Sequence, residues 1–263
     1  MKALDREISY ASFLDQLRSV SARVLLLDYD GTLAPFTVDR SLALPYPGVA
    51  DRMIRIIETG TRITLISGRP AREVVSLIGI HPHPEVWGSH GLERLKADGS
   101  YEMCQIPLQQ QAGLSLAVQL LQAVQLDSQT EIKPGSVAVH WRGLSPSEVD
   151  EIKSKIRHLW LPLVTEYPLS LLEFDGGLEL RVPGRDKGDA IRAILTETNP
   201  EAAIAYLGDD QTDEDAFRAL KGRGLTALVR PQPRPTAADI WLQPPQELIE
   251  FFDNWLKASG GEL

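Results

Sequence analysis

The sequence predicts an α/β fold with a Rossmann-like core built on a parallel sheet, into which an α+β domain is inserted. Short apolar runs alternate along the chain with segments whose apolar residues recur at helical spacing. Chemically active side chains directly follow several of these runs, as they do at the carboxyl ends of strands in open α/β sheets. Residues 106–178 change to a rhythm of helix, strand, helix and hairpin, which indicates a second domain within a core of residues 1–105 and 179–263.

The first part of the core is expected to alternate strands and helices. Val24–Leu27 is an apolar run of the kind that is buried on both faces inside a parallel sheet. Gly60 supplies a helix end and Pro70 suits the first turn of a helix. The expected elements are a strand at 24–27, a helix at 48–59, a strand at 62–66, a helix from 70 to about 78, and a short strand at 86–91 that turns into a glycine-rich loop.

The inserted domain and the rest of the core follow from the same patterns. Ser145 and Glu148 resemble a capping box that opens a helix, and residues 175–177 suit the turn of a hairpin. The expected elements are a helix at 108–126, a strand at 136–141, a helix from 145 to about 160, hairpin strands at 169–174 and 178–182, a helix at 188–198, strands at 203–207 and 226–229, and a helix at 246–257. Residues 231–235 are expected to form an extended loop without a functional signal.

Composition narrows the class of protein. The 263 residues are 43% hydrophobic and 24% charged, which is ordinary for a soluble globular protein. A net charge of −9 argues against a general binder of nucleic acid or of anionic membranes. The single cysteine, Cys104, allows no internal disulfide, and no apolar run approaches membrane-spanning length. With no apolar signal core at the start, we expect a soluble cytoplasmic protein, for which a monomer is compatible with the sequence.

The end of the first strand carries the most informative residues. Asp28 and Asp30 follow Val24–Leu27, and Gly31 allows a tight turn after them. Two carboxylates at a strand end repel each other and lose hydration unless a cation or a proton is shared. In phosphoryl transfer, Asp28 could attack phosphorus and Asp30, which points to the same side, could move a proton. The alternative is a turn whose aspartates cap the next segment.

Three further signals follow strands or precede helices. Ser67, after the second strand, could donate to a phosphoryl oxygen, although a helix cap is an alternative. Lys187, before a predicted helix, could hold a nucleophile and a phosphate together, or could belong to a solvated loop. Residues 209–215 hold five acidic side chains in seven positions, which is more than a helix cap requires. Mg²⁺ prefers such hard oxygen ligands, and Asp209 with Asp28 would supply them.

Taken in order, these motifs resemble the haloacid dehalogenase superfamily of phosphotransferases, and most closely its trehalose-6-phosphate phosphatases. The resemblance rests on four fragments, Leu27–Leu33, Ile66–Arg69, His90–Glu93 and Gly208–Phe217. It implies a hydrolase core and a movable cap, the inserted domain. It also implies that Asp28 is the nucleophile, Asp30 the general acid and base, and Ser67 and Lys187 the phosphate ligands. Mg²⁺ would be held by Asp28, the backbone carbonyl of Asp30, and Asp209, with Asp213 orienting a metal-bound water.

The resemblance also implies which residues bind the sugar part of a small sugar-phosphate substrate. Glu131, Lys133 and Glu179 match family positions that contact the sugar, and Glu93 matches another position near it. Arg142, directly after the strand predicted at 136–141, is a further candidate for substrate binding. Without the family, Glu131 and Lys133 would be read as charges on a solvated strand edge.

Three alternatives to hydrolysis of trehalose 6-phosphate stay open at this point. A phosphatase of another sugar phosphate, such as a glycosyl-phosphoglycerate or sucrose phosphate, would share the core residues and differ in the cap. A sugar phosphomutase would return the phosphoryl group to its substrate. A non-catalytic sugar-phosphate-binding protein would have no use for Asp30 beside Asp28.

Overall fold

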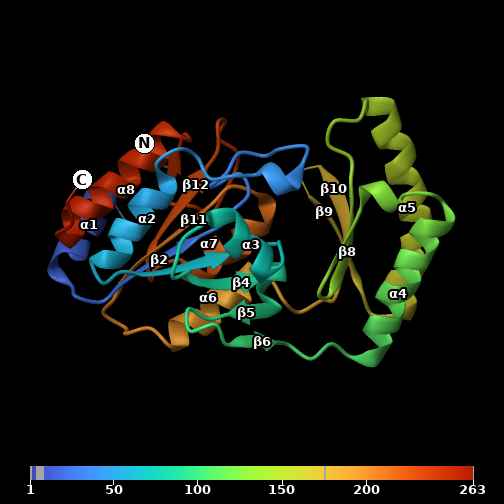
Figure 1. The fold of residues 1–263 in the computed structure, drawn as a ribbon, viewed down its shortest axis with the longest axis horizontal. Helices are drawn as coiled ribbons and strands as arrows, with labels where there is room; N and C mark the ends of the chain where they lie inside the picture. Colours follow the sequence, from blue (N-terminus) through green and yellow to red (C-terminus); the bar gives the residue numbers. More distant parts are fainter. Residues whose placement is uncertain (1, 4–8, 175, 263) are drawn as a thin grey trace. The chain divides into compact units, whose positions relative to one another are not determined.

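A computed structural model of the chain describes residues 2–3, 9–174 and 176–262. The chain forms two compact units. Unit 1 comprises Met1–Glu102 and Asp186–Leu263, and unit 2 comprises Met103–Arg185. The mixture of a parallel-dominated sheet in one unit and an antiparallel sheet with helices in the other confirms the predicted fold class (Figure 1).

Unit 1 is built on a nine-stranded sheet. Its strands are β1 (Lys2–Ala3), β2 (Arg23–Leu27), β3 (Arg62–Ile66), β4 (Glu85–Gly88), β5 (Glu93–Leu95), β6 (Tyr101–Met103), β11 (Ala203–Gly208), β12 (Leu225–Val229) and β13 (Ile240–Leu242). They are ordered β1-β13-β12-β11-β2-β3-β4-β5-β6. The strands from β13 to β4 are parallel, whereas β1 and β5 pair antiparallel to their neighbours. The central pair, β11 and β2, places two functional loops side by side.

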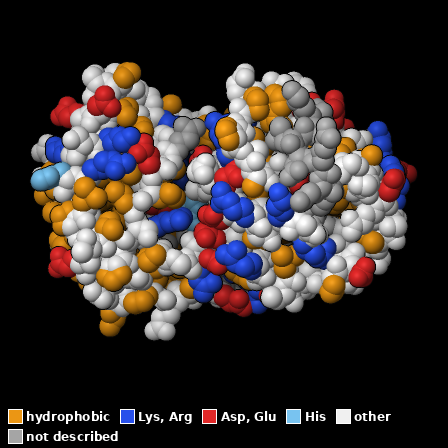
Figure 2. Space-filling view, turned by 180° about the vertical axis from the view of Figure 1, so that it is seen from behind, with side chains coloured by type: hydrophobic (Ala, Val, Ile, Leu, Met, Phe, Trp, Pro, Cys, Tyr) orange, Lys and Arg blue, Asp and Glu red, His pale blue; other side chains and the backbone are white. Residues whose placement is uncertain are grey.

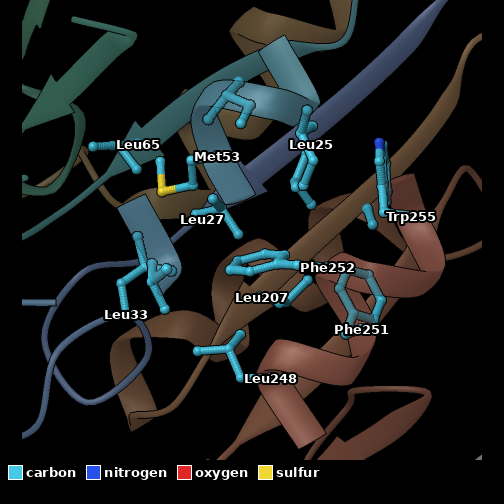
Figure 3. Close-up of a cluster of buried hydrophobic side chains, with 14 of the residues drawn as sticks. Leu25, Leu27, Leu33, Met53, Leu65, Leu207, Leu248, Phe251, Phe252 and Trp255 are labelled. Carbon is cyan, nitrogen blue, oxygen red and sulfur yellow. The ribbon is translucent and has the colours of Figure 1, made fainter. Parts of the chain in front are cut away.

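Helices cover both faces of this sheet. Successive strand residues point to opposite sides, so alternate residues of a strand pack against the helices of one face and of the other. The helices are α1 (Tyr10–Ser19), α2 (Val49–Glu58), α3 (Ala71–Ile78), α6 (Lys187–Thr196), α7 (Glu214–Leu220) and α8 (Gln246–Ser259). Leu25 and Leu27 pack against α1, α2, α3 and α8, while Val24 and Leu26 pack against α6 and α7. Figure 3 shows Leu25 and Leu27 in the first of these cores, with Trp255 of α8 nearby. β2 is therefore buried on both faces, as its apolar run predicts.

Unit 2 is an antiparallel sheet covered on one face by two helices. The strands are β7 (Thr130–Lys133), β8 (Ser136–His140), β9 (Ser170–Phe174) and β10 (Gly177–Arg181), in the order β7-β8-β10-β9, and the helices are α4 (Leu108–Ala123) and α5 (Pro146–Glu166). Val137, Val139 and Leu178 pack with Trp160 of α5 in one buried cluster. Residues between these positions, such as Glu179, therefore lie on the opposite face of the sheet. The capping box that opens α5 is present.

The structure places the second domain boundary later in the chain than the sequence predicts. β10 pairs with both β8 and β9, so a boundary after residue 178 would divide a strand of the unit 2 sheet. Unit 2 instead continues to Arg185. The hairpin of β9 and β10 is present, while Asp175 in its turn lies outside the described residues. The short strands β5, β6 and β13 and the helix α1 were not among the expected elements.

The described helices include none that combines the length and the apolar character needed to cross a membrane. On the face drawn in Figure 2, Lys and Arg side chains lie among Asp and Glu side chains. The face shown thus mixes both signs of charge, in keeping with a composition that argues against a general nucleic-acid surface.

Candidate active site

The structure brings most of the predicted core residues to one edge of the unit 1 sheet. Asp28 follows β2, Ser67 follows β3 and Asp209 follows β11, and these three strands are adjacent and parallel. The Asp28 amide donates to the Leu207 carbonyl at 2.9 Å, so the sheet ladder continues up to the carboxylate. This edge is where open α/β sheets place their ligands.

Lys187, the first residue of α6, binds two carboxylates at once. Its Nζ donates to Asp28 Oδ1 at 2.6 Å and to Asp213 Oδ1 at 2.7 Å. Lys187 and Asp28 are each only 3% exposed, and Asp213 is fully buried. Asp28 Oδ2 also accepts from the Thr32 hydroxyl at 3.0 Å, so both oxygens of the predicted nucleophile are oriented. This ion pair rules out the reading of Lys187 as a solvated loop residue.

The site holds more negative than positive charge. Lys187 pairs with Asp28 and Asp213, the Asp209 carboxylate lies close to these two, and all three carboxylates are buried. Burial raises the pKa of Asp28 to about 7, with Lys187 opposing the shift and Asp213 adding to it. Burial, followed by repulsion from Asp28, also raises the pKa of Asp209 well above its ordinary value. The charged forms are therefore costly here unless a further cation is present.

The carboxylates meet the requirements of a divalent cation. Oxygens of Asp28, Asp209 and Asp213 lie within 4.8 Å of one another. The Asp209 carboxylate is buried, and no donor to it is found among the described residues. Mg²⁺ takes hard oxygen ligands such as these, and it would relieve the uncompensated charge. The residues present therefore fit a magnesium ion.

Asp213 is held by four hydrogen-bond donors. Besides Lys187, the hydroxyl of Tyr206 donates to its Oδ1. Its Oδ2 accepts from the backbone amides of Asp209 at 3.0 Å and Asp210 at 2.9 Å. Asp213 thus fixes the loop that carries Asp209 and neutralises the positive charge of Lys187. Tyr206, a buried residue inside β11, was missed at the sequence level because it looks like an ordinary strand residue.

The five acidic residues of 209–215 have different positions and contacts. Asp209 and Asp213 face the site, Asp210 caps the following turn, and Asp215 pairs with Arg218 at the surface. Glu214 is buried and binds the loop that follows β12, where it accepts from Arg234, Thr236 and Ala237.

The loop at 231–235 is more than a connection. Arg234 Nη2 donates to the Asp210 carbonyl at 2.7 Å, and Arg230 Nη1, just before the loop, donates to the Asp209 carbonyl at 3.2 Å. Both arginines therefore support the acidic loop from behind. The arginines beside the prolines of this segment were the available signal, and their partners lie too far back in the sequence to be inferred from it.

Asp30 faces a different partner from Asp28. Its two carboxylate oxygens accept from the Arg69 guanidinium, with Nε to Oδ2 at 2.6 Å and Nη2 to Oδ1 at 2.7 Å. The Asp30 side chain is 25% exposed, so it is accessible to solvent and to a ligand. Its side chain is not among the clustered carboxylates, and the metal role implied for Asp30 concerns its backbone carbonyl alone.

Ser67 and Glu93 are buried within unit 1. Ser67 Oγ accepts from the Arg69 amide at 3.1 Å, which leaves its hydroxyl hydrogen for an acceptor. Glu93 accepts from the Ala71 amide at 3.0 Å, where α3 begins, and from the hydroxyls of Ser89 and Tyr101 at 2.8 Å. These contacts join Glu93 to the start of α3, and none of them involves the cluster around Lys187.

Three of the predicted sugar contacts meet on one face of the unit 2 sheet. Lys133 Nζ donates to Glu179 Oε1 at 2.7 Å and lies 3.6 Å from Glu131 Oε2. Glu131 and Glu179 both register with Ala138, on the strand between them. His140, which was not assigned a role, hydrogen-bonds Glu131 at 2.8 Å. Arg142 packs over Gly176 in the same unit.

The absence of a side chain at Gly31 leaves room for the Asp209 carboxylate. Gly31 has a φ of +83°, and a Cβ there would lie 2.2 Å from Asp209 Oδ2. Gly31→Ala is therefore expected to destabilise the fold by more than the roughly 1–2 kcal/mol of a left-handed alanine. Gly60→Ala is the matched control, since Gly60 has a φ of +80° and nothing within 4 Å of an added Cβ. Denaturant unfolding of both variants measures the difference, and equal losses would contradict the steric role of Gly31.

Comparison with known proteins adds the family context. A family model described as trehalose-phosphatase matches residues 26–245. A protein named probable trehalose-phosphate phosphatase H, from Arabidopsis thaliana, is 30% identical over 253 residues, which are 87% of this chain and 70% of that protein. A trehalose-phosphate phosphatase from Mycobacterium leprae is 30% identical over 254 residues, and the match covers 86% of this chain. The chain spans only 56% of the length of that relative.

Solved structures agree on the fold. The C-terminal domain of trehalose-6-phosphate phosphatase from C. albicans superposes with a TM-score of 0.75 at 19% identity, covering 99% of both chains. A trehalose-6-phosphate phosphatase from Aspergillus fumigatus gives a TM-score of 0.65 at 23% identity, again over 99% of both chains. At this level of identity the likeness supports the fold of both units, while the family model and the sequence relatives carry the family assignment.

Proposed function

The chain belongs to the trehalose-phosphatase family, and from this premise we propose that it hydrolyses trehalose 6-phosphate to trehalose and phosphate through a phosphoenzyme formed on Asp28. The observation that carries the proposal is the buried ion pair of Lys187 with Asp28 at the carboxyl end of β2. Burying a carboxylate this far from water costs folding stability, and groups buried at such a cost are concentrated at functional sites. An oriented carboxylate beside a fixed cation suits attack on a phosphoryl group.

The reaction would proceed in two balanced steps. An oxygen of Asp28 forms a bond to phosphorus while the bond from phosphorus to the sugar oxygen breaks, and Asp30 gives that oxygen a proton. Water then attacks phosphorus, Asp30 takes back a proton, and the bond from phosphorus to Asp28 breaks to release phosphate. Lys187 and the Ser67 hydroxyl bind phosphoryl oxygens throughout and hold the group in line.

We further propose that the reaction requires Mg²⁺ held by Asp28 and Asp209, with the backbone carbonyl of Asp30 as a third protein ligand. When bound, the ion would neutralise phosphoryl charge and align the attack. Asp213 would act from behind these ligands, since its own oxygens accept from Lys187, Tyr206 and two backbone amides.

The sugar is assigned to the polar face of the unit 2 sheet. Glu131, Lys133 and Glu179 present two carboxylates and an ammonium in one hydrogen-bonded group. Such groups suit a ligand rich in hydroxyls, and a site that bonds those hydroxyls rejects analogues that lack them. Glu93, which accepts from the Ala71 amide, and Arg142, which packs over Gly176, are further candidates for binding the substrate.

Removing one of these side chains should weaken use of the sugar phosphate. Glu179→Ala is expected to lower kcat/KM for trehalose 6-phosphate by about 10–100-fold, the effect of losing a hydrogen bond to a charged group. Glu131→Ala and Lys133→Ala should act in the same direction. Glu173→Ala is the matched control, since Glu173 lies on β9 and pairs with Lys153 and Arg157 at the surface. Near-unchanged kcat/KM in all three test variants would rule out this assignment.

A substrate panel tests the proposed function itself. The protein is incubated with Mg²⁺ and separate sugar phosphates, and released phosphate is measured with and without a chelator. Release from trehalose 6-phosphate in preference to sucrose phosphate and a glycosyl-phosphoglycerate is expected. Preference for another ester would transfer the assignment to that substrate. Product that keeps its phosphate would indicate a mutase, and binding without turnover would indicate a non-catalytic sugar-phosphate-binding protein.

A further inference from the structure

We propose that Arg69 is a positioning residue that fixes the carboxylate of Asp30 for proton transfer to the sugar oxygen, an inference that rests on the proposed phosphatase function. The two side chains form a bidentate pair, with Nε to Oδ2 at 2.6 Å and Nη2 to Oδ1 at 2.7 Å. Two parallel bonds fix the plane of a carboxylate as well as its position. A single donor would leave that plane free to rotate.

Arg69 is itself held rigidly. It is only 1% exposed, and its Nη1 donates to the Arg40 carbonyl at 3.0 Å and to the carboxylate of Glu73, in the first turn of α3. Its guanidinium carbon lies 6.0 Å from the centre of the Tyr29 ring. Every nitrogen of the guanidinium therefore has an acceptor, and the two that face Asp30 have little freedom to move. A lysine could not reproduce this fork of donors.

The backbone of Arg69 ties the same residue to the phosphate ligand. Its amide donates to Ser67 Oγ at 3.1 Å, and its carbonyl accepts from the Ser89 amide at 2.8 Å. Arg69 thus links the hydroxyl that would hold the phosphoryl group with the carboxylate that would protonate the leaving oxygen. The spacing between a bound phosphoryl group and its acid would therefore be set through one buried residue, by its backbone on one side and its side chain on the other.

This role predicts an effect that depends on the leaving group. A sugar oxygen leaves poorly unless it receives a proton, so a misplaced acid slows its departure. Acetate leaves from acetyl phosphate as a stable anion and needs no proton. A residue that only supported the fold would slow both reactions alike. The ratio of kcat/KM for the sugar phosphate to kcat/KM for acetyl phosphate therefore isolates the positioning of Asp30.

The experiment measures this ratio in Arg69→Met, Arg69→Lys and, as reference, Asp30→Asn. General acid catalysis contributes about 10²–10⁴-fold, so we expect the ratio to fall by about 100-fold or more in Asp30→Asn and by about 10–100-fold in Arg69→Met. The ratio should fall in Arg69→Lys as it does in Arg69→Met, because lysine keeps the positive charge but loses the two parallel donors of the guanidinium. It also keeps a cation beside Asp30 and Glu73, so it serves the test if Arg69→Met does not fold.

Arg94→Met is the matched control. Arg94 is partly buried in unit 1 and, like Arg69, binds two carboxylates, here Glu85 and Glu197. Its loss should lower thermal stability and leave the ratio unchanged. An equal fall with both substrates in the Arg69 variants, or an unchanged ratio, would overturn the assignment of Arg69 alone. Absence of phosphate release from both substrates by the unaltered protein would overturn the proposed function together with it.

Discussion

Asp28→Asn is expected to abolish phosphate release, lowering kcat by about 10⁴-fold or more, as removal of a covalent nucleophile does. The amide keeps the size of the side chain and can still meet Lys187 and Thr32, but it cannot form the bond to phosphorus. Single-turnover release of phosphate from trehalose 6-phosphate measures the loss. Asp15→Asn is the control, because Asp15 pairs with Arg18 on an exposed helix surface. Substantial activity in Asp28→Asn would contradict the covalent mechanism.

The same substitution should leave the fold as stable as before. Burial raises the pKa of Asp28 to about 7, so the folded protein disfavours the charged side chain at higher pH. Asparagine carries no charge and removes that cost, and Lys187 keeps Asp213 as a partner. In a metal-free buffer above pH 7 we therefore expect the Tm of Asp28→Asn to equal or exceed that of the unaltered protein. A lower Tm would mean that the Asp28 carboxylate stabilises the fold, against its raised pKa.

The central site was predictable because each of its parts is a local pattern. Asp28, Ser67 and Asp209 directly follow apolar runs, and parallel strands bring such positions to one edge without further information. The order of the motifs along the chain then separated this arrangement from an ordinary turn. Lys187 had the weakest local signal, and only the fold reveals the ion pair that fixes it.

The parts that were not predicted depend on contacts between distant segments. Tyr206 looks like a core strand residue, and its hydroxyl matters only because Asp213 returns beside it. Arg234 needs the Asp210 carbonyl as a partner, and nothing in its own loop indicates that contact. The boundary near residue 178 was misplaced for a similar reason, since β10 belongs to unit 2 through its pairing with β8 and β9. Hydrophobic periodicity marks a strand and does not say which sheet it joins.

Magnesium is expected to stabilise the protein, and more strongly at higher pH. The pKa of Asp28 rises from 3.8 to about 7 on folding, so between these values the folded chain holds a proton that the unfolded chain has released. Stability of the metal-free protein therefore falls as the pH rises through this window. The raised pKa of Asp209 acts in the same direction. A cation that binds these carboxylates competes with the protons, so its apparent affinity, and with it the stabilisation, increases as the pH rises and the protons leave.

Thermal unfolding with and without Mg²⁺ tests this linkage. An ion at 100 times its Kd adds about 2.7 kcal/mol to the free energy of unfolding. At a fixed Mg²⁺ concentration, the increase in Tm should be larger at about pH 8 than at about pH 6, because protons occupy the ligands at the lower pH. Asp209→Asn removes a carboxylate for which no donor is found among the described residues, so it should abolish the increase, while Asp15→Asn should keep it. An increase that is the same at both pH values, or that survives in Asp209→Asn, would place the ion outside the cluster of Asp28, Asp209 and Asp213.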